Sequence, residues 1–518
     1  MTSALPSVPR LSEHTRPASE ERRGRALVTG AATVAALVVF ASATLFARQG
    51  LAALFFLAAV LVGGLLMIGR RRVWTGHLVM VLVALLLLFP AQFRISQLGA
   101  LGSPGALVGL AAFALWLIGL VLRRPWMAAH RHPLRWMLLG LALSTMASFL
   151  AASYRPIDGL ESRAAVRGLI TILVIAGMVL VVSDTLLTRL DIRRLVQVLV
   201  MCGSVVSLLG VLQFRTGIDI SSVISIPGFT YRPEEYSGER SGFVRIVSTT
   251  TNPLELAVVL AILLPLALYL GFTSSGRKRT FWFVNAGIIS ATIPMTVSRT
   301  AIVAAAVGLF VMMLGWPWRR RWHVLLVGLV GLVAVRLAIP GLAGTLYSFL
   351  FSAGGDPSLA SRDRGQLFAL RFFAERPLLG RGFGTYIPDR YVFLDNQVLL
   401  SAVETGVVGL VALFGLMITA IFLGLGVRRA ARGPAAAHDR ELALALLAGV
   451  VTGTVVMVTF DALTFPTSRG LTMIVLGMVG ALWRIVRNDV DWAAARAKRL
   501  AHPVEPDRPT DRPPAMSS

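Results

Sequence analysis

Cysteine and lysine are almost absent from this chain of 518 residues, which has one cysteine and, among 50 basic residues, only Lys278 and Lys498 as lysines. A single cysteine, Cys202, cannot form an intramolecular disulfide or a cluster of thiolate metal ligands. The seven histidines are scattered and show no metal-ligand spacing such as His-Glu-x-x-His. The sequence therefore predicts no disulfide framework and no metal site.

Charged residues are also scarce: they make up 15% of the chain, whereas 56% of the residues are hydrophobic and the mean hydropathy is +0.74. A soluble protein needs charged residues at nearer a quarter of its positions. The apolar residues form blocks of about 17 to 25, the length that crosses roughly 30 Å of hydrocarbon. Because alternating strand patterns are absent, the backbone can satisfy its hydrogen bonds in lipid only as helices. We predict an all-α polytopic membrane protein.

These blocks predict about fourteen membrane spans, an even number that places both termini on one side. Arginines cluster at block ends, as in Arg70-Arg71-Arg72 and Arg319-Arg320-Arg321, which is the positive-inside pattern of cytoplasmic loops. We therefore expect a multi-pass protein of the inner (plasma) membrane with both termini in the cytoplasm. The net charge of +24 then follows from membrane topology, and nucleic-acid binding is not expected. The predicted spans are residues 26–47, 50–69, 75–91, 104–122, 134–153, 168–183, 195–213, 254–272, 281–297, 301–317, 322–338, 398–425, 441–460 and 470–486.

The polar ends of the chain, residues 1–25 and 501–518, are rich in proline and are expected to be disordered cytoplasmic tails around a helical domain at 26–500. Two predicted extracytoplasmic loops, about 214–253 and about 339–397, are much longer than the rest. Long loops are uncommon unless they have a function. We expect the chemistry of the protein there.

Arginines occur in both long loops and in a tight outer turn, against the positive-inside pattern. Arg299 lies in that turn, where a charge is costly unless it faces a cavity or a partner. Two simpler alternatives stay open: long loops are translocated whatever their charge, and Arg299 can extend to lipid headgroups. Guanidinium groups bind phosphate oxygens with two hydrogen bonds and keep their charge. The candidate anion-binding residues are Arg299, Arg362, Arg245, Arg364 and Arg381.

The second long loop has order of its own. Residues 363–376 predict an amphipathic helix, with Leu367 and Leu370 on one stripe, and Pro377 ends it. The run from Gly380 to Gly384 that follows has glycine at every second position, a pattern that can turn backbone N–H groups inward to bind an anion. It is not a dinucleotide fingerprint, because no strand precedes it and no helix opens from it. Glu404 lies inside the next apolar block and is expected to pair with an arginine or to act as a base.

The order of these motifs resembles the O-antigen ligase and O-antigen polymerase superfamily. The resemblance covers about residues 240 to 425, and each motif alone is degenerate. The matching pieces are Arg245 with Thr250-Thr251-Asn252-Pro253, Ser298-Arg299, Ser361-Arg362, Pro377-Leu378-Leu379-Gly380-x-Gly382, Asp395-Asn396-x-x-Leu399 and Glu404-x-Gly406-x-x-Gly409.

The resemblance implies a GT-C-like membrane glycosyltransferase that acts outside the cytoplasm on glycans linked to undecaprenyl diphosphate. It implies no cofactor, nucleotide sugar or catalytic metal, and it assigns the outer arginines to the diphosphate leaving group. The expected partners are the lipid-linked glycan, membrane lipid and further proteins of polysaccharide assembly. The resemblance also implies that Asp395 and Glu404 are catalytic candidates and that Gly380, Gly382 and Asn396 belong to a substrate loop.

One departure from the family is that Asp395 stands where the ligases have a histidine, and neither long loop contains a histidine. Asp395 or Glu404 could take the proton from the attacking hydroxyl, or the reaction needs no strong base because the diphosphate is a good leaving group. The departure favours a polysaccharide polymerase over a ligase.

Three alternatives to a polymerase or ligase are compatible with a helical membrane protein: a lipid-linked-oligosaccharide flippase or polysaccharide transporter, a non-catalytic scaffold or sensor, and an enzyme that uses polyprenyl-phosphate sugars. The first should have charges between two similar halves, and the second needs a soluble partner domain. The third usually needs carboxylates in the first outer loop, which is only Ala47-Arg48-Gln49-Gly50. Sugar, linkage and acceptor are not encoded in any recognisable motif.

Overall fold

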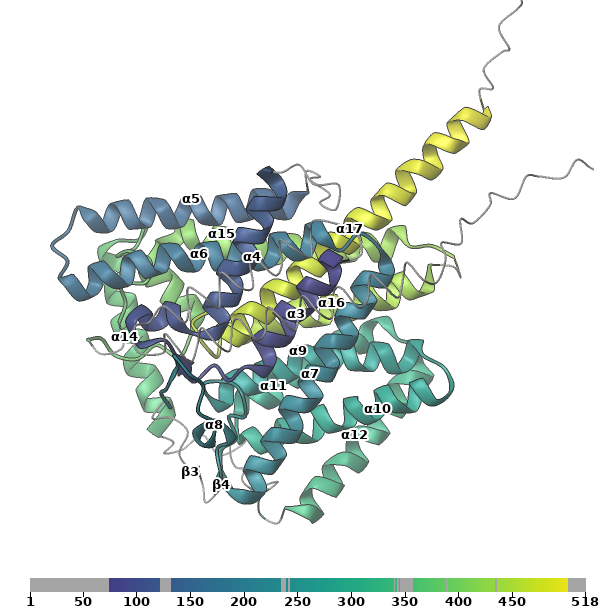
Figure 1. Ribbon diagram of the computed structural model, residues 1–518, viewed down its shortest axis with the longest axis horizontal. Coiled ribbons are helices and arrows are strands. Elements are labelled where there is room, and N and C mark those ends of the chain that lie inside the picture. Colours follow the sequence, from purple (N-terminus) through teal and green to yellow (C-terminus); the bar gives the residue numbers. More distant parts are fainter. Residues whose placement is uncertain are drawn as a thin grey trace, which may run out of the picture.

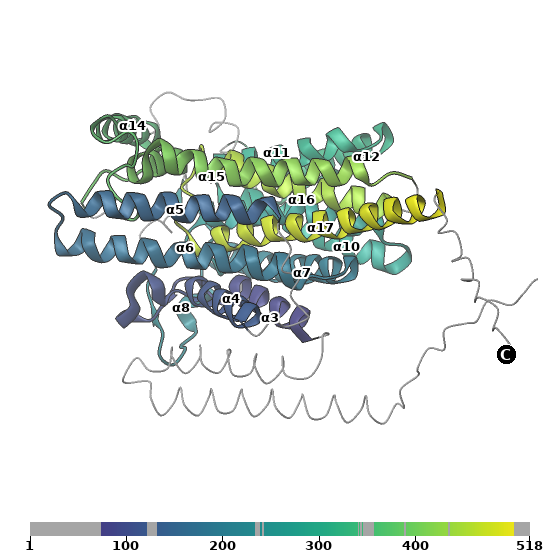
Figure 2. The same cartoon turned by 90° about the horizontal axis from the view of Figure 1, so that it is seen from above.

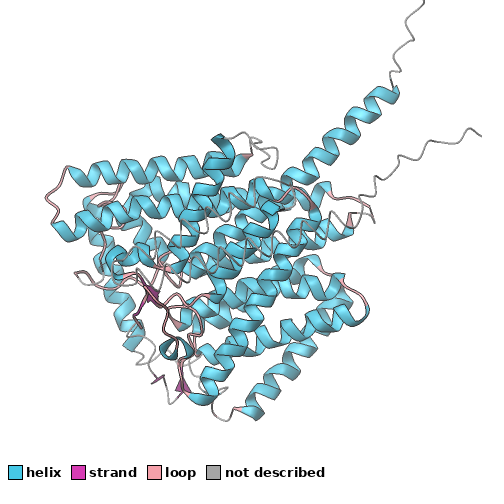
Figure 3. Ribbon diagram, in the orientation of Figure 1, coloured by secondary structure: helices cyan, strands magenta, loops and turns pink. Residues whose placement is uncertain are grey.

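The structure is a computed structural model that describes residues 74–121, 132–233, 239–240, 243–339, 341, 344, 357–387, 390–433 and 436–501. The predicted spans at 26–47 and 50–69, the first outer loop and the tail at 1–25 lie outside the described residues, as does the tail from residue 502 onward. The described chain is almost entirely helical (Figure 3), as the absence of strand patterns predicts.

The helices follow one another along the chain with short connections, apart from the two long loops. Each predicted span within the described residues coincides with a helix, although several helices begin a turn or more earlier. The helices are α3 (Trp74–Leu88), η1 (Ser96–Gly102), α4 (Pro104–Val121), α5 (Pro133–Ser153), α6 (Gly159–Thr185), α7 (Arg189–Thr216), α8 (Ile220–Val223), α9 (Pro253–Thr273), α10 (Gly276–Thr292), η2 (Ile293–Thr296), α11 (Arg299–Gly315), α12 (Trp318–Ala338), α14 (Pro357–Glu375), α15 (Gln397–Ala430), α16 (Ala437–Val456) and α17 (Pro466–Ala501).

Seven of the described helices are long and apolar enough to cross a membrane: α4, α5, α6, α7, α9, α15 and the Pro466–Val490 part of α17. Helices α3 and α11 are apolar but shorter. Figure 2 shows α5, α6, α15 and α17 running side by side along the bundle. The structure is therefore that of a polytopic helical membrane protein, and the total of fourteen crossings stays a prediction.

The helix boundaries follow from capping residues in the sequence. Asn252 caps α9 by accepting the amide of Glu255 at 2.8 Å, and Pro253 occupies the first helical position, where a missing N–H costs nothing. Thr188 and Asp191 form a capping box at the start of α7, and Gly217 ends that helix in the left-handed conformation.

Helices α9 and α17 form the centre of the bundle, and nearly every side chain of their apolar stretches is buried. Helix α9 packs against α7, α10, α11 and α16, whereas α17 packs against α6, α15 and α16. A helix that is apolar all round must be buried in protein or face lipid, and α9 and α17 are buried in protein. The polar starts of both helices are therefore held in fixed positions at the centre of one end of the bundle.

That end of the bundle bears the long connections, among them α8 and α14, while α17 runs out at the opposite end (Figure 2). Two short antiparallel strand pairs order the first loop: β1 (Phe93–Arg94) with β2 (Thr230–Tyr231), and β3 (Glu239–Arg240) with β4 (Phe243–Val244). We refer to this as the loop end. The basic clusters at the starts of α10 and α12 and at the end of α15 lie on helix ends away from it.

The amphipathic helix predicted at 363–376 exists as α14 and begins six residues earlier. Its buried face consists of Gly365, Ala369 and the partly buried Phe372, which pack on the loop beneath. Leu367 and Leu370 of the predicted apolar stripe are 70% and 57% exposed. An apolar stripe turned away from the protein is typical of a helix that lies in the membrane interface.

Candidate functional site

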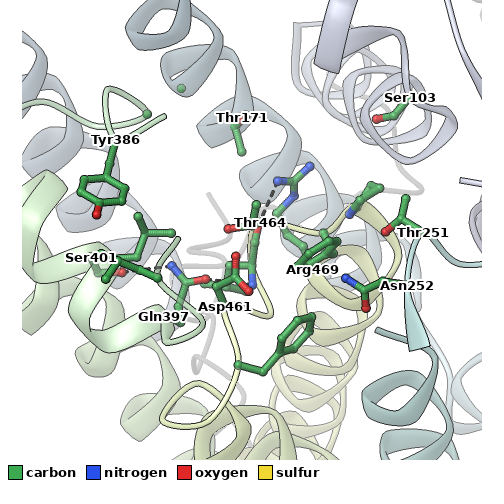
Figure 4. Close-up of a pocket in the computed structure, with 18 of the residues that line it drawn as sticks. Ser103, Thr171, Thr251, Asn252, Tyr386, Gln397, Ser401, Asp461, Thr464 and Arg469 are labelled. Carbon is green, nitrogen blue, oxygen red and sulfur yellow. Dashed lines mark hydrogen bonds between the residues drawn. The ribbon is translucent and has the colours of Figure 1, made fainter. Parts of the chain in front are cut away.

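An open cavity of about 1300 Å³ lies at the loop end of the bundle. Figure 4 shows polar side chains from several helices and loops pointing into it. Segments far apart in the sequence meet here, since the lining extends from residue 91 to residue 469. Its charged lining consists of the basic residues Arg94, Arg167, Arg232, Arg245, Arg299 and Arg469 and the acidic residues Asp395, Glu404 and Asp461.

Arg299 and Arg245, the arginines predicted from the tight turn and the first long loop, both line this cavity. Arg299 is the first residue of α11 and follows Val297, whose φ of 49° reverses the chain direction between η2 and α11. The Nε of Arg245 donates to the Thr296 carbonyl of that same turn at 3.4 Å. The structure therefore brings the two predicted cations to one wall although they are distant in sequence.

Asp395 and Asn396 lie where the second long loop enters α15. Asn396 is the N-cap: its Oδ1 accepts the amides of Val398 at 2.9 Å and Leu399 at 3.1 Å. Its Nδ2 donates to the Val458 carbonyl at 2.7 Å, which ties the cap to the segment after α16. Asp395, directly before this cap, is half-buried and lines the cavity. The capped helix start fixes its position. Asn396 instead lines a smaller neighbouring pocket of about 190 Å³.

Glu404 lines the cavity and is buried, but its carboxylate is already engaged by the glycine-rich segment. Oε1 accepts the backbone amide of Tyr386 at 3.3 Å, and the Gly384 amide also donates to this carboxylate. Its backbone carbonyl accepts the amide of Gly382 at 3.0 Å and the hydroxyl of Ser148 at 2.7 Å. Glu404 thus holds the glycine-rich segment against α15. The sequence analysis expected its carboxylate to pair with an arginine or to act as a base, and in the structure backbone amides donate to it.

Helix α15 is broken at Gly406, whose φ of 64° and ψ of −164° are not helical. The segment Pro377 to Gly382 crosses α15 at this break, and each main chain supplies the other with hydrogen bonds. The amides of Val407 and Val408 donate to the carbonyls of Pro377 and Leu378, and the amides of Arg381 and Gly382 donate to those of Val403 and Glu404. The crossing segment thus supplies hydrogen bonds in place of helical ones that are lost at the break.

The predicted anion-binding nest needs a correction for this reason. The amides of Gly380, Arg381 and Gly382 donate to the carbonyls of Arg376, Val403 and Glu404. These amides therefore bind protein carbonyls, whereas the sequence analysis expected them to bind an anion. A Cβ at Gly380 would lie 2.4 Å from the Glu404 main chain, and one at Gly406 would lie 2.3 Å from the Leu378 carbonyl oxygen. What the glycines allow is the close crossing of two main chains.

Two further predicted arginines, Arg364 and Arg381, lie outside the cavity lining. Arg381 stacks on the Phe372 ring with 4.2 Å between Cζ and the ring centroid, and it pairs with Glu375 at 3.3 Å. Arg364 is exposed on α14. Arg362 also lies on α14, at a position where the structure describes the helix but not the side chain. The cavity therefore joins Arg245 and Arg299 with Asp395 and Glu404, but not with Arg381 or Arg364.

A buried ionic cluster fixes the second long loop to the α5–α6 connection. Arg155 pairs with Glu161 at 2.7 Å, and its Nε donates to the Arg381 carbonyl at 3.0 Å. The Tyr391 hydroxyl donates to the same Glu161 carboxylate, and burial together with this bond raises the pKa of Tyr391. Burial likewise raises the pKa of Tyr386, which stacks on Tyr391, to about 12. Both phenols stay protonated and act as donors that fasten this loop beside the cavity.

Four basic residues of the cavity were not among the predicted site residues: Arg94, Arg167, Arg232 and Arg469. Arg94 follows the predicted span 75–91, and Arg167 and Arg469 directly precede the predicted spans 168–183 and 470–486. The signal that could have found them is the one used for Arg299, namely a cation at the outer end of an apolar block. Among the residues that the structure describes, no group of three or more His, Cys, Asp or Glu residues could hold a metal ion.

Comparison with known proteins adds one assignment. A family model described as O-antigen ligase matches residues 284–414, which include Arg299, Asp395 and Glu404 and the broken start of α15. No curated protein matches the chain. Together with the long apolar helices, the family match identifies a multi-pass membrane protein. The chain therefore contains, at residues 284–414, a region that matches the O-antigen ligase family and supports its place in the O-antigen ligase-like superfamily.

Proposed function

We propose that the protein is a membrane glycosyltransferase that transfers glycans from undecaprenyl diphosphate, on the extracytoplasmic side of the plasma membrane, and that it is a polysaccharide polymerase more than a ligase. The observation that supports this most directly is the cavity, where Arg245 and Arg299 lie on one wall with Asp395 and Glu404 in the same lining. A diphosphate is an anion with several oxygens, and guanidinium groups are its most suitable protein donors.

The reaction follows from the charges of this lining. A hydroxyl of the acceptor glycan attacks the anomeric carbon of the donor glycan, a new glycosidic C–O bond forms, and the bond from that carbon to the phosphate oxygen breaks. Negative charge grows on the departing diphosphate, and Arg245 and Arg299 stabilise it. Because the arginines are placed before the reaction, little reorganisation is needed as the charge develops.

Asp395 is the better candidate for the base that accepts the proton of the attacking hydroxyl. It lies at the cavity edge on a capped helix start, whereas the carboxylate of Glu404 is bound by the amides of Gly384 and Tyr386. Glu404 is then a positioning residue, since it holds the loop and the helix break that shape the cavity. The aspartate at the position of the ligases' histidine remains the reason to favour polymerisation.

The proposed topology places the loop end of the bundle, and the cavity with it, outside the cytoplasm. Arginine clusters such as Arg319-Arg320-Arg321 lie at the start of α12, away from that end, where the positive-inside rule expects cytoplasmic residues. The end of α17 lies away from the loop end as well (Figure 1, yellow). This arrangement supports cytoplasmic termini and an extracytoplasmic site.

Reconstitution tests this function. Purified full-length protein in lipid vesicles is given the lipid-linked glycan extracted from cells that lack the protein, and products are sized by gel electrophoresis. We expect longer glycans and released undecaprenyl diphosphate from the wild type, and neither from Arg299→Ala. The matched control is Arg163→Ala, an exposed arginine on α6 one turn from Arg167 and outside the cavity, which should leave elongation unchanged. Undiminished elongation by Arg299→Ala would refute the assignment.

A further inference from the structure

Arg469, near the start of α17, is a cavity residue that belongs to none of the sequence motifs. It is buried, with 8% of its surface exposed, and Figure 4 shows it among the side chains that line the pocket. Its Nη1 donates to the Leu463 carbonyl at 3.0 Å. Its Nε is also buried and has no hydrogen-bond partner among the residues that the structure describes. The guanidinium therefore has donor capacity that the described protein does not use.

Glu255 fixes the place of Arg469 by joining the starts of two central helices. Its Oε1 accepts the amides of Thr467 at 2.7 Å and Ser468 at 3.1 Å, in the first turn of α17. Its Oε2 accepts the amide and hydroxyl of Thr251, before α9, at 2.8 Å and 2.6 Å. A single carboxylate thus caps α17 from the neighbouring helix. Arg469 projects from a helix turn whose position is set by these bonds.

The same bonds exclude the helix amides as the anion site. Because Glu255 already occupies the amides of Thr467 and Ser468, an anion in the cavity meets the side chain of Arg469 and not the amides at the start of α17. Glu255 interacts electrostatically with Arg469, which offsets the cost of burying the cation, but its oxygens are used for the capping bonds. A buried cation is costly unless it has partners for its donors, and in a membrane protein it indicates a functional site.

We propose that Arg469 binds a phosphate oxygen of the lipid-linked glycan, as a further diphosphate-binding residue that sequence motifs do not reveal. This role rests on the proposed function. It gives the diphosphate a cation from α17, in addition to Arg299 from α11 and Arg245 from the loop before α9. Cations on three separate elements would fix the orientation of the diphosphate, so that the anomeric carbon points toward the acceptor.

A binding experiment tests this without the need to know the sugar. Purified full-length protein in nanodiscs is titrated with undecaprenyl diphosphate, and undecaprenyl monophosphate and undecaprenol serve as comparison lipids. The variants are Arg469→Gln and Arg469→Lys, with Arg299→Ala in the same assay. The matched controls are Arg484→Gln and Arg484→Lys: Arg484 is on the same helix, is also buried, donates to the Leu186 carbonyl at 2.6 Å, and does not line the cavity.

We expect the Kd for undecaprenyl diphosphate to rise about 10- to 100-fold in Arg469→Gln, the loss typical of a charged hydrogen bond. Arg469→Lys should show a smaller rise, and both Arg484 variants should bind like the wild type even where their thermal stability falls. If Arg469→Gln does not fold, the Kd values of Arg469→Lys and Arg484→Lys for undecaprenyl diphosphate are compared, and a rise confined to Arg469→Lys supports the role of Arg469.

The outcomes separate this inference from the proposed function. If the wild type binds undecaprenyl diphosphate, Arg299→Ala does not, and the Arg469 variants bind like the wild type, the role of Arg469 is overturned and the proposed function stands. If the wild type does not distinguish undecaprenyl diphosphate from undecaprenol, both are overturned. Equal losses in the Arg469 and Arg484 variants would show a general effect of uncharging α17 and would also overturn the assignment.

Discussion

Gly380 lies directly on the main chain of Glu404: a Cβ at Gly380 would come within 2.4 Å of the Glu404 carbonyl carbon and oxygen. The contact joins the glycine-rich segment of the second long loop to α15, the helix that contributes Glu404 to the cavity. Two motifs that are separate in the sequence, the Pro-Leu-Leu-Gly run and the Glu-x-Gly run, are therefore two sides of one crossing.

The crossing predicts that Gly406 cannot be replaced. Gly406→Ala places a Cβ 2.3 Å from the Leu378 carbonyl oxygen and puts alanine at φ 64° and ψ −164°, a region open essentially to glycine alone. We expect a loss of about 3 kcal/mol or more in the free energy of unfolding, measured as a fall in Tm in detergent. Gly426→Ala is the control, because it lies on the same helix with open space around it. Equal Tm values for the two variants would contradict the strain argument.

The identity of the cation at residue 299 should affect activity in a graded way. Arg299→Lys keeps the charge but loses the planar fork that binds two phosphate oxygens, so we expect elongation to fall about 10- to 100-fold, against complete loss in Arg299→Ala. Initial rates of elongation in vesicles measure this. Full activity of Arg299→Lys would mean that point charge alone suffices and that the bidentate geometry is not used.

Asp395 and Glu404, the two predicted catalytic carboxylates of the cavity, should differ in their effects on activity. Asp395→Asn removes a base without changing size, and we expect kcat to fall about 100-fold or more with an unchanged Tm. Glu404→Gln retains an oxygen that can accept the Tyr386 amide, so it should lower kcat much less. Steady-state kinetics of both variants at several pH values provide the measurement. The reverse order of kcat losses would assign the base to Glu404.

The helices were predictable from the sequence because the physics behind them is local. An apolar block of sufficient length must be helical in lipid, and Asn252, Thr188 and Gly217 mark helix ends by capping rules that need no knowledge of neighbours. The starts of α6 and α17 were placed too late, because residues 159–167 and 466–469 include polar and charged side chains and lie at the loop end beside the cavity.

The site was predictable only in part because its partners are distant in sequence. Arg245, Arg299, Asp395 and Glu404 each gave a local signal, and the structure places them around one cavity. Arg469 has a local signal, a cation at the outer end of an apolar block, but its place in the cavity depends on a contact between residues 255 and 467 that no local pattern encodes. The glycine run was misjudged for the same reason: its pattern fits an anion nest, but α15 lies across it and takes the amides.

The buried cluster at the α5–α6 connection should matter for stability. Glu161→Gln leaves the buried Arg155 without its countercharge, so we expect a loss of about 3–5 kcal/mol in the free energy of unfolding. Glu375→Gln, which removes the half-exposed partner of Arg381, should cost less than about 1 kcal/mol. Thermal unfolding of the wild type and both variants measures these two losses. Equal losses would show that burial of the ion pair is not what stabilises the loop.

Stability should also depend on pH through His132, at the start of α5. Burial, followed by the charges of Arg135 and Arg484, lowers the pKa of His132 from 6.5 to about 4. Between these values the unfolded chain binds a proton that the folded chain does not, so stability is fully present above pH 6.5 and falls by up to about 1.4 kcal/mol per pH unit below it. Tm measured from pH 7.5 to 4.5 should fall less steeply in His132→Gln than in the wild type, whereas the control His438→Gln, at an exposed histidine of α16, should follow the wild type. Parallel pH profiles for all three proteins would exclude His132 as the cause.

The bond between Glu255 and the start of α17 has a consequence for biosynthesis. Glu255 leaves the ribosome 212 residues before Thr467, whose amide it binds, so during translation the carboxylate enters the membrane bundle before its capping partner has been made. Until α17 inserts, the chain holds an acidic group with half of its acceptors unfilled beside the cavity. Synthesis of α17 therefore adds Arg469 to the cavity lining, and under the proposed function a chain translated only as far as α16 lacks this part of the lipid-binding site.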